Sequence, residues 1–249
     1  MARSATAPKL DLLVVSVGCP CGIGPEVSVR AAAKLPGTVL VGDWHMLLEA
    51  AELVGVPTKR LQPFTDECAD PRAIYVRSVG PRLAARDRKP GKPNAASGAA
   101  QLSYINEAYR LTKAAPRRAL VTGPVSKAAI AHSGVPGAAR FLGHTEWLRD
   151  LDGSDLSVMC FAAGPLVTSL VTTHLPIAKV PKAITPRGVS DATFHLGELC
   201  SPSVKNARRS PSARSIRTPV RANSWAPKSA RRSCRAFARR PNAWGNARS

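Results

Sequence analysis

Between residues 10 and 200, short apolar runs that suit β-strands alternate with segments that carry apolar residues at helical spacing. The run DLLVVSVG at 11–18 is apolar through its middle and rich in valine, which is typical of a strand buried on both faces. The segment at 25–35 begins with Pro25 and Glu26, as helices often do, and continues with good helix formers. This repeated alternation predicts an α/β protein built on a largely parallel sheet.

The same alternation predicts further elements along the chain. A second strand and helix are expected at 38–43 and 44–55, where Gly55 would end the helix. A longer helix is expected at 98–114, and a strand, a turn and a helix at 117–134. The stretch at 156–176 predicts two more strands, of which the second would end at His174. A chain of 249 residues is long enough to form one large domain or two modest domains.

The alternation stops near residue 200, where the composition changes. Residues 201–249 hold 13 of the 36 Lys and Arg residues and none of the 16 Asp and Glu residues, so they carry +13 of the net charge of +20. A segment rich in Arg, Ser, Ala and Pro has little apolar surface to bury, which predicts disorder. We therefore expect an α/β part at 1–199 and a disordered basic tail at 200–249. Such a tail would bind nucleic acid only non-specifically, with strong salt dependence.

Several classes of protein are disfavoured by the composition. No apolar run approaches the roughly 18 residues of a membrane span, and the start of the chain has no signal-peptide pattern. The cysteines are scattered and include no C-x-x-C pair, which argues against a zinc finger or a disulfide framework. Reduced thiols and a cytoplasmic location are the expectation. The six cysteines are Cys19, Cys21, Cys68, Cys160, Cys200 and Cys234.

The stretch GCPCGIGPE at 18–26 follows the first predicted strand and contains three glycines. Its spacing is not the G-x-G-x-x-G of a dinucleotide fingerprint, and the chain has no G-x-x-x-x-G-K-[ST] phosphate loop. Cys19 and Cys21 would make a poor metal chelate without a second pair of ligands nearby. Two interpretations stay open: a tight turn that only joins a strand to a helix, or a loop at the ligand-binding edge of the sheet.

Two places among the five histidines suit ligand binding. His144 and Thr145, in GHTE, place an imidazole beside a hydroxyl, a pair that can hydrogen-bond an anionic or hydroxylated ligand. His174 ends a predicted apolar strand, and ligands gather at the carboxyl ends of strands. No ligand role is assigned to the remaining histidines, which are His45, His132 and His195.

Four stretches together resemble the 4-hydroxythreonine-4-phosphate dehydrogenase family, whose members act in pyridoxal phosphate synthesis. GCPCGIGPE is similar to the family's GDPAGIGPE. ALVTGPVSKAAI at 119–130, GHTEWL at 143–148 and LVTTHLPIAKVPKAIT at 170–185 follow in the right order. The resemblance covers residues 10 to about 190. The chain departs from the family at Cys19, where the family usually has Asp, so the contribution of that carboxylate is missing.

The resemblance implies a fold and a reaction. The fold would be the two-domain α/β architecture of the isopropylmalate-dehydrogenase type, as a homodimer. The reaction would be NAD- or NADP-dependent oxidation of 4-phosphooxy-L-threonine to 2-amino-3-oxo-4-phosphooxybutanoate, followed by decarboxylation to 3-amino-2-oxopropyl phosphate. A divalent metal (Zn, Mg or Co) would lower the pKa of the substrate hydroxyl and stabilise the enolate.

The resemblance also implies site residues. His144 and Thr145 would bind the small phosphorylated hydroxy-amino-acid substrate, and His174 would be one of three histidines that bind the metal. No catalytic residue is assigned, and the dinucleotide-binding residues are unknown. Two alternatives stay open: a related metal-dependent dehydrogenase of a phosphorylated sugar acid or a dihydrodiol, and an inactive basic-tailed binding protein.

The two companion histidines would stand in NPHAGE-like and YHDQG-like motifs, and no histidine follows His195 in this chain. Reverse translation of 215–229 in the neighbouring frame admits Asn-Pro-His-Ala-Gly-Glu and then Leu-Leu-Gly-x-Glu-Glu. We therefore hypothesise that residues from about 200 onward are read out of frame, after a slip between Phe194 and Lys205. The metal site would then be incomplete, and the chain as translated would have little activity.

Overall fold

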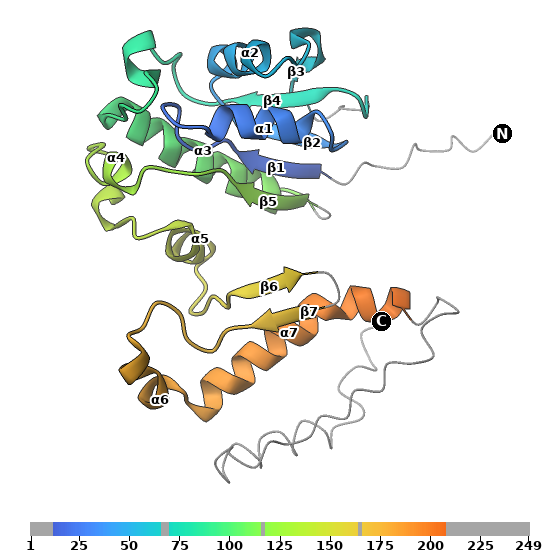
Figure 1. Cartoon of the computed structure of the whole chain (residues 1–249), viewed down its shortest axis with the longest axis vertical. Helices are drawn as coiled ribbons and strands as arrows, with labels where there is room; N and C mark the ends of the chain where they lie inside the picture. Colours follow the sequence, from blue (N-terminus) through green and yellow to red (C-terminus); the bar gives the residue numbers. More distant parts are fainter. Residues whose placement is uncertain (1–11, 66–69, 116–117, 164–165, 208–249) are drawn as a thin grey trace, which may run out of the picture. The chain divides into compact units, whose positions relative to one another are not determined.

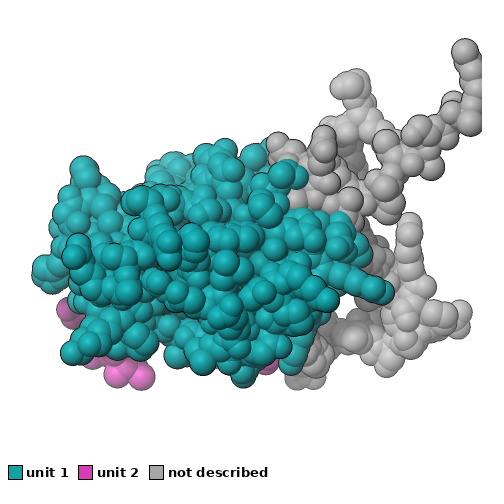
Figure 2. All heavy atoms as spheres, turned by 90° about the horizontal axis from the view of Figure 1, so that it is seen from above, with its two compact units in different colours: residues 1–155 teal, residues 156–249 magenta. Residues whose placement is uncertain are grey.

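The computed structural model describes residues 12–65, 70–115, 118–163 and 166–207. The chain divides into two compact units, residues 1–155 (unit 1) and residues 156–249 (unit 2), which Figure 2 colours separately. Each unit is described by itself. Within the described ranges, no helix combines the length and the apolar character that crossing a membrane requires.

Unit 1 is built on a five-stranded parallel sheet with the strand order β3-β4-β2-β1-β5 (Figure 1). In the central register, Val14 of β1 lies opposite Val39 of β2 and Leu120 of β5. Val14 and Val39 are buried, as the continuous apolar runs predict. The predicted α/β fold with a parallel sheet is therefore confirmed; β3 and β4 have no counterpart among the predicted elements. The strands are β1 (Leu12–Ser16), β2 (Thr38–Gly42), β3 (Leu61–Pro63), β4 (Ile74–Ser78) and β5 (Arg118–Thr122).

Helices cover both faces of this sheet. The chain moves from β1 to β2 in one direction and from β4 to β5 in the other, and such crossovers are right-handed. Helices α1 and α2 therefore lie on one face and α3 on the opposite face. In agreement, α1 packs on α2, whereas α3 contacts β1, β2, β5 and α4. The described helices are α1 (Gly24–Ala32), α2 (Trp44–Leu53), α3 (Ala95–Lys113), α4 (Lys127–Ala131) and α5 (His144–Asp152), with short 3₁₀ segments η1 (Thr58–Arg60), η2 (Ala85–Arg88) and η3 (Ala138–Arg140).

Besides a small group of Val39, Ala73 and Tyr75, two apolar clusters hold the described part of unit 1 together. The larger cluster lies between the sheet and its helices, and its members Leu40, Leu47 and Ile74 are completely buried. Burying one such side chain stabilises the fold by roughly 1.5–3 kcal/mol. The smaller cluster fixes the start of α5, where His144 lies. It consists of Leu102, Ile105, Ile130, Ala138 and Phe141, with Trp147 and Leu148 packed against it.

Unit 2 contains a two-stranded antiparallel sheet and three helical segments. Helix α7 packs on β7. Within 156–163 and 166–200, Ala192 is the one buried apolar side chain, while Phe161, Leu166 and Ile177 are more than half exposed. Its elements are β6 (Cys160–Ala163), β7 (Leu166–Ser169), η4 (Ile177–Lys179), α6 (Val180–Ala183) and α7 (Pro186–Ala207).

Two boundaries in unit 2 differ from the sequence prediction. The strand predicted to end at His174 ends at Ser169. The N–H of Leu170 still donates to the Met159 carbonyl at 2.9 Å, but no later described residue extends this strand pairing. Helix α7 continues through Ala207, beyond residue 199. Positions 208–249 of the predicted tail lie outside the described residues.

Candidate functional site

The carboxyl ends of β1 and β5 define the place in unit 1 where a ligand is expected. β1 leads into α1 on one face of the sheet, whereas β5 leads into α4, which packs on α3 at the opposite face. Neighbouring parallel strands whose connections leave toward opposite faces mark the usual ligand site of open α/β sheets. The segments that leave this switch point are residues 17–23 after β1 and 123–126 after β5.

The glycines after β1 and β5 allow two backbones to approach each other closely. Gly18 has a φ of 82°, a left-handed conformation that glycine adopts without strain. A Cβ on Gly18 would lie 2.2 Å from the carbonyl oxygen of Pro124, and a Cβ on Gly123 would lie 2.6 Å from that of Val17. The N–H of Cys19 donates to the Pro124 carbonyl at 2.8 Å. The stretch is therefore a tight turn held against the β5–α4 loop, and the backbone of that loop occupies the space beside Gly18.

The first turns of α3 support the β5–α4 loop through a chain of hydrogen bonds. Asn94 and Ser97 form a reciprocal capping box at the start of α3. The fully buried Gln101 donates from Nε2 to the Ser97 carbonyl at 3.0 Å and accepts at Oε1 from the Ser126 N–H at 2.7 Å. Ser126 in turn caps α4 with its side chain. These bonds fix the position of Lys127, the first residue of α4.

His144 begins α5 in the neighbourhood of Lys127. The Nζ of Lys127 lies 3.6 Å from the position that a Cβ on Gly143 would take, at the N-terminus of α5. Nε2 of His144 is buried without a hydrogen-bond partner in the described structure, while Thr145 is exposed. Burial, and then the charge of Lys127, lowers the pKa of His144 below its usual range. The imidazole is therefore neutral near pH 7, and its Nε2 is a buried polar atom that still lacks a hydrogen-bond partner.

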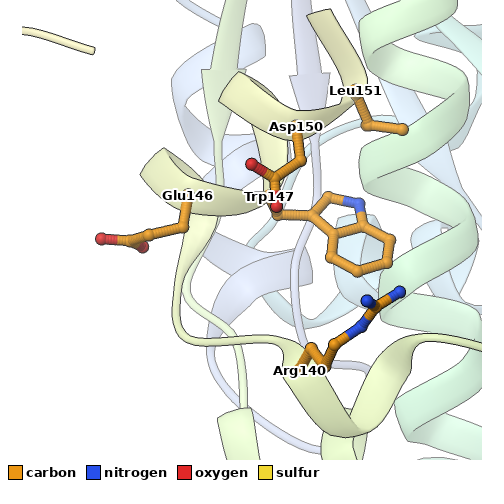
Figure 3. A pocket seen from close by; sticks show the side chains of 5 residues that line it. All are labelled: Arg140, Glu146, Trp147, Asp150 and Leu151. Carbon is orange, nitrogen blue, oxygen red and sulfur yellow. The ribbon is translucent and has the colours of Figure 1, made fainter. Parts of the chain in front are cut away.

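An open hollow of about 250 Å³ lies in the same unit, beside α5. Figure 3 shows the Trp147 ring between the side chains of Asp150 and Arg140. His144 and Thr145 do not line this hollow, so we do not assign it to the substrate. Its lining residues are Arg140, Glu146, Trp147, Asp150 and Leu151.

His174 lies in unit 2, between β7 and η4, and it is exposed. Among the described ranges it is the one non-glycine residue with a positive φ, 57°. A left-handed conformation costs such a residue about 1–2 kcal/mol, and strain of this kind clusters at functional sites.

A metal ion needs more ligands than His174 supplies. Residues 12–207, apart from the gaps in the description, contain no group of three His, Cys, Asp or Glu side chains that could hold a metal. A working site uses about three protein ligands. The described residues therefore do not fit a bound metal, and we derive no reaction step through one.

The structure thus places the predicted residues in two units. His144 and Thr145 are neighbours at the start of α5, and His174 belongs to unit 2. Lys127 belongs to this neighbourhood, although no sequence pattern assigned it a role. Its signal was present, because it is a cation at the first position of a helix that directly follows a strand and a turn.

The fold and the switch point define this chain as an α/β protein with a parallel sheet and candidate ligand-binding groups at the carboxyl edge of that sheet. A family model described as pyridoxal phosphate biosynthetic protein PdxA matches residues 34–208. The chain belongs to this family, as the four sequence stretches predict.

Relatives and solved structures agree with this assignment. The chain is 37% identical over 189 residues to 4-hydroxythreonine-4-phosphate dehydrogenase of Acidithiobacillus ferrooxidans. This match covers 74% of this chain and 54% of the relative. It is 32% identical over 218 residues to a protein of Bradyrhizobium diazoefficiens named as a candidate D-threonate 4-phosphate dehydrogenase, covering 81% of this chain and 60% of the relative.

Among solved structures, the chain is similar to the crystal structure of a 4-hydroxythreonine-4-phosphate dehydrogenase from Burkholderia phymatum. The TM-score is 0.64 at 26% identity, and the match covers 75% of this chain and 57% of the other. The chain therefore spans little more than half the length of the proteins that it matches.

Proposed function

We propose that this chain is the N-terminal part of an NAD- or NADP-dependent dehydrogenase that oxidises 4-phosphooxy-L-threonine. The product is 2-amino-3-oxo-4-phosphooxybutanoate, which then loses CO₂ to give 3-amino-2-oxopropyl phosphate in pyridoxal 5′-phosphate synthesis. Membership of the PdxA family and the names of its relatives support the oxidoreductase class.

The observation that carries this proposal is the buried Nε2 of His144, which has no partner among the described residues. Thr145, which is exposed, follows His144 at the start of α5, and the charge of Lys127 acts on the His144 imidazole. The Glu146 carboxylate and the Lys127 ammonium both lie near Gly143, at the same helix start. A substrate with a hydroxyl group and a phosphate offers matching chemistry, since the imidazole and hydroxyl can hydrogen-bond its oxygens and the ammonium attracts its negative charge. We assign substrate binding to His144 and Thr145 on this basis.

His174 is proposed as one ligand of a divalent metal, Zn, Mg or Co. Its left-handed backbone supports a functional role. The functional form is proposed to be a cytoplasmic homodimer of the isopropylmalate-dehydrogenase type.

The division of the chain at about residue 200 is also a proposal. Residues 1–199 are taken as the dehydrogenase part, and residues 200–249 as an out-of-frame basic segment. The match to the family model ends at residue 208, close to the proposed slip. The nucleotide sequence tests this directly: the neighbouring frame must encode Asn-Pro-His within 215–229, and any other reading there refutes the slip.

A phosphorylated sugar acid is the second candidate substrate. The relative from Bradyrhizobium diazoefficiens carries the name of a D-threonate 4-phosphate dehydrogenase. D-threonate 4-phosphate shares a phosphate, a carboxylate and one hydroxyl with 4-phosphooxy-L-threonine and carries a second hydroxyl in place of the amino group, so the neighbourhood of His144 suits both.

Calorimetric titration of the 249-residue chain with each of the two compounds tests the proposal. We expect His144→Ala to weaken binding by about 10-fold or more, because a hydrogen bond to a charged ligand contributes roughly 1.5–3 kcal/mol. His132→Ala is the matched control, since His132 is exposed and its Nδ1 contacts the Ala128 carbonyl at 2.8 Å. Equal affinity of wild type and His144→Ala would remove His144 from the site. Tighter binding of D-threonate 4-phosphate would select the second substrate.

A turnover assay completes the test. NAD⁺ or NADP⁺ reduction with added Zn²⁺, Mg²⁺ or Co²⁺ is expected to be weak in this chain, because His174 alone does not hold a metal firmly. Rapid turnover would contradict the expectation of an incomplete site.

A further inference from the structure

The Cys19-Pro20-Cys21 sequence is a feature that the proposed function does not use. In the motif GDPAGIGPE, which this stretch resembles, the two positions hold Asp and Ala, so neither thiol belongs to that motif. Both side chains are buried, with exposed fractions of 6% and 4%, and both are free thiols. They stand immediately after β1, at the switch point of the sheet.

The backbone brings these two thiols toward each other. The N–H of Gly22 donates to the Cys19 carbonyl at 3.1 Å, which closes a β-turn with Pro20 at its favoured second position. Consecutive Cα atoms are about 3.8 Å apart, so a chain folded at roughly a right angle over Pro20 leaves the Cα atoms of Cys19 and Cys21 about 5.4 Å apart. Disulfides join Cα atoms that are about 4.4–6.8 Å apart. A β-turn of this kind therefore allows the Cα separation that a disulfide requires.

The electrostatics agree with this proximity. Burial is the main reason that the pKa of the Cys21 thiol is raised, and the neighbouring Cys19 raises it further. Each thiol is thus part of the other's immediate surroundings.

We propose that Cys19 and Cys21 are a modification site that forms a reversible disulfide, with a low-molecular-weight disulfide as the oxidant. One cysteine attacks the oxidant as its thiolate and releases one small thiol. The second cysteine then attacks the mixed disulfide and releases the other small thiol. Two electrons and two protons pass from the cysteines to the oxidant, and one S–S bond replaces another. Because both thiols are buried, the exchange requires transient opening of the turn and is slow.

Disulfide formation would change the contacts of a second loop. The Cys21 thiol donates to the Asp87 carbonyl at 3.3 Å, and the Gly91 N–H donates to the Cys21 carbonyl at 2.8 Å. A disulfide sulfur has no hydrogen to donate, so oxidation removes the first of these bonds. The 85–91 segment is then tied to the turn by fewer contacts, and the bond after the exposed Arg86 should become more accessible to trypsin.

Peptide mapping of the intact 249-residue chain tests the proposal. The chain is equilibrated with mixtures of reduced and oxidised glutathione, alkylated and digested with trypsin. Residues 10–30 form one tryptic peptide that contains Cys19 and Cys21 and no other cysteine. We expect this peptide to escape alkylation under oxidising conditions, to be lighter by two hydrogen atoms, and to regain both alkylation sites after dithiothreitol treatment. The proposal would be overturned if, at every ratio of reduced to oxidised glutathione, this peptide carried two alkyl groups or was modified by glutathione alone.

Variants separate this pair from other thiols. Cys21→Ala places at residue 21 the alanine of the motif GDPAGIGPE. In this variant the 10–30 peptide should no longer lose the mass of two hydrogen atoms on oxidation, and Cys19 should be free or linked to glutathione. Cys160→Ala removes a thiol of unit 2 and should leave the behaviour of the 10–30 peptide unchanged. A cross-link from the 10–30 peptide to another cysteine-containing peptide, lost in Cys160→Ala, would assign the oxidation to a different pair.

The effect on the 85–91 segment has its own test. Trypsin cleavage after Arg86 should be faster in oxidised than in reduced wild type, and the oxidant should not change the cleavage rate of Cys21→Ala. Equal cleavage rates for oxidised and reduced wild type would refute the link to the 85–91 segment.

Discussion

Gly98 offers a sharp test of the way α4 is held against α3, because helix propensity and packing predict opposite effects of adding one methyl group. Gly98 is a buried interior residue of α3, where replacing glycine by alanine usually favours the helix by about 1 kcal/mol. In this structure, a Cβ at residue 98 would lie 1.9 Å from the carbonyl oxygen of Ala129 and 2.4 Å from its carbonyl carbon. These are backbone atoms of α4, which cannot rotate away as a side chain can.

The size of the effect follows from this distance. Ordinary contact begins at 3.4 Å, so α4 would have to move by about 1.5 Å. A gap of roughly 1 Å already loses up to half of the dispersion energy of the contacts around it, including those of the fully buried Ile130. Because the approach of 1.9 Å is to backbone atoms, the cost of overpacking should lie at the upper end of its usual range, about 3 kcal/mol. Helix propensity returns about 1 kcal/mol, so we expect Gly98→Ala to lose about 2 kcal/mol of unfolding free energy.

Urea unfolding followed by circular dichroism at helical wavelengths measures this loss. Gly197→Ala is the matched control, because Gly197 lies exposed in α7 and a Cβ there would meet nothing within 4 Å. The same substitution should therefore stabilise α7 by up to about 1 kcal/mol. If Gly98→Ala is as stable as wild type or more stable, the close approach of α3 and α4 is wrong.

Two further predictions concern the same neighbourhood. Gln101→Leu leaves the Ser126 N–H without its acceptor and should cost about 1–3 kcal/mol in urea unfolding; a change below about 0.5 kcal/mol would show that this bond does not hold the loop. In an NMR titration, His144 should take up its proton at lower pH than a free imidazole, because burial and Lys127 lower its pKa, and Lys127→Gln should shift the midpoint partway upward. Since the unfolded chain binds this proton first, stability should fall as pH decreases below about 6.5; an unshifted midpoint would contradict the buried position of the ring.

Patterns within short segments determined much of this protein. The valine-rich run before Gly18 specified β1, because a strand covered on both faces favours apolar residues at consecutive positions, here Leu12 to Val15. The helical spacing after residue 97 specified most of α3, although its start at Ala95 depends on a cap at Asn94. The family, too, was predictable, since its motifs are contiguous stretches.

Tertiary structure decided what those segments do to one another. The strand order brought the turn after β1 against the loop after β5. Only glycine fits at residue 18, because the carbonyl oxygen of Pro124, over a hundred residues away in sequence, occupies the space that a Cβ would need. The tertiary fold also placed Lys127 near His144, and it placed the Cys21 thiol in contact with Asp87 of the 85–91 segment. Periodicity and helix propensity act over a few residues, whereas these contacts depend on which strands pair and which faces the helices cover. That choice is made by burial over the whole unit, and no single stretch of the chain contains it.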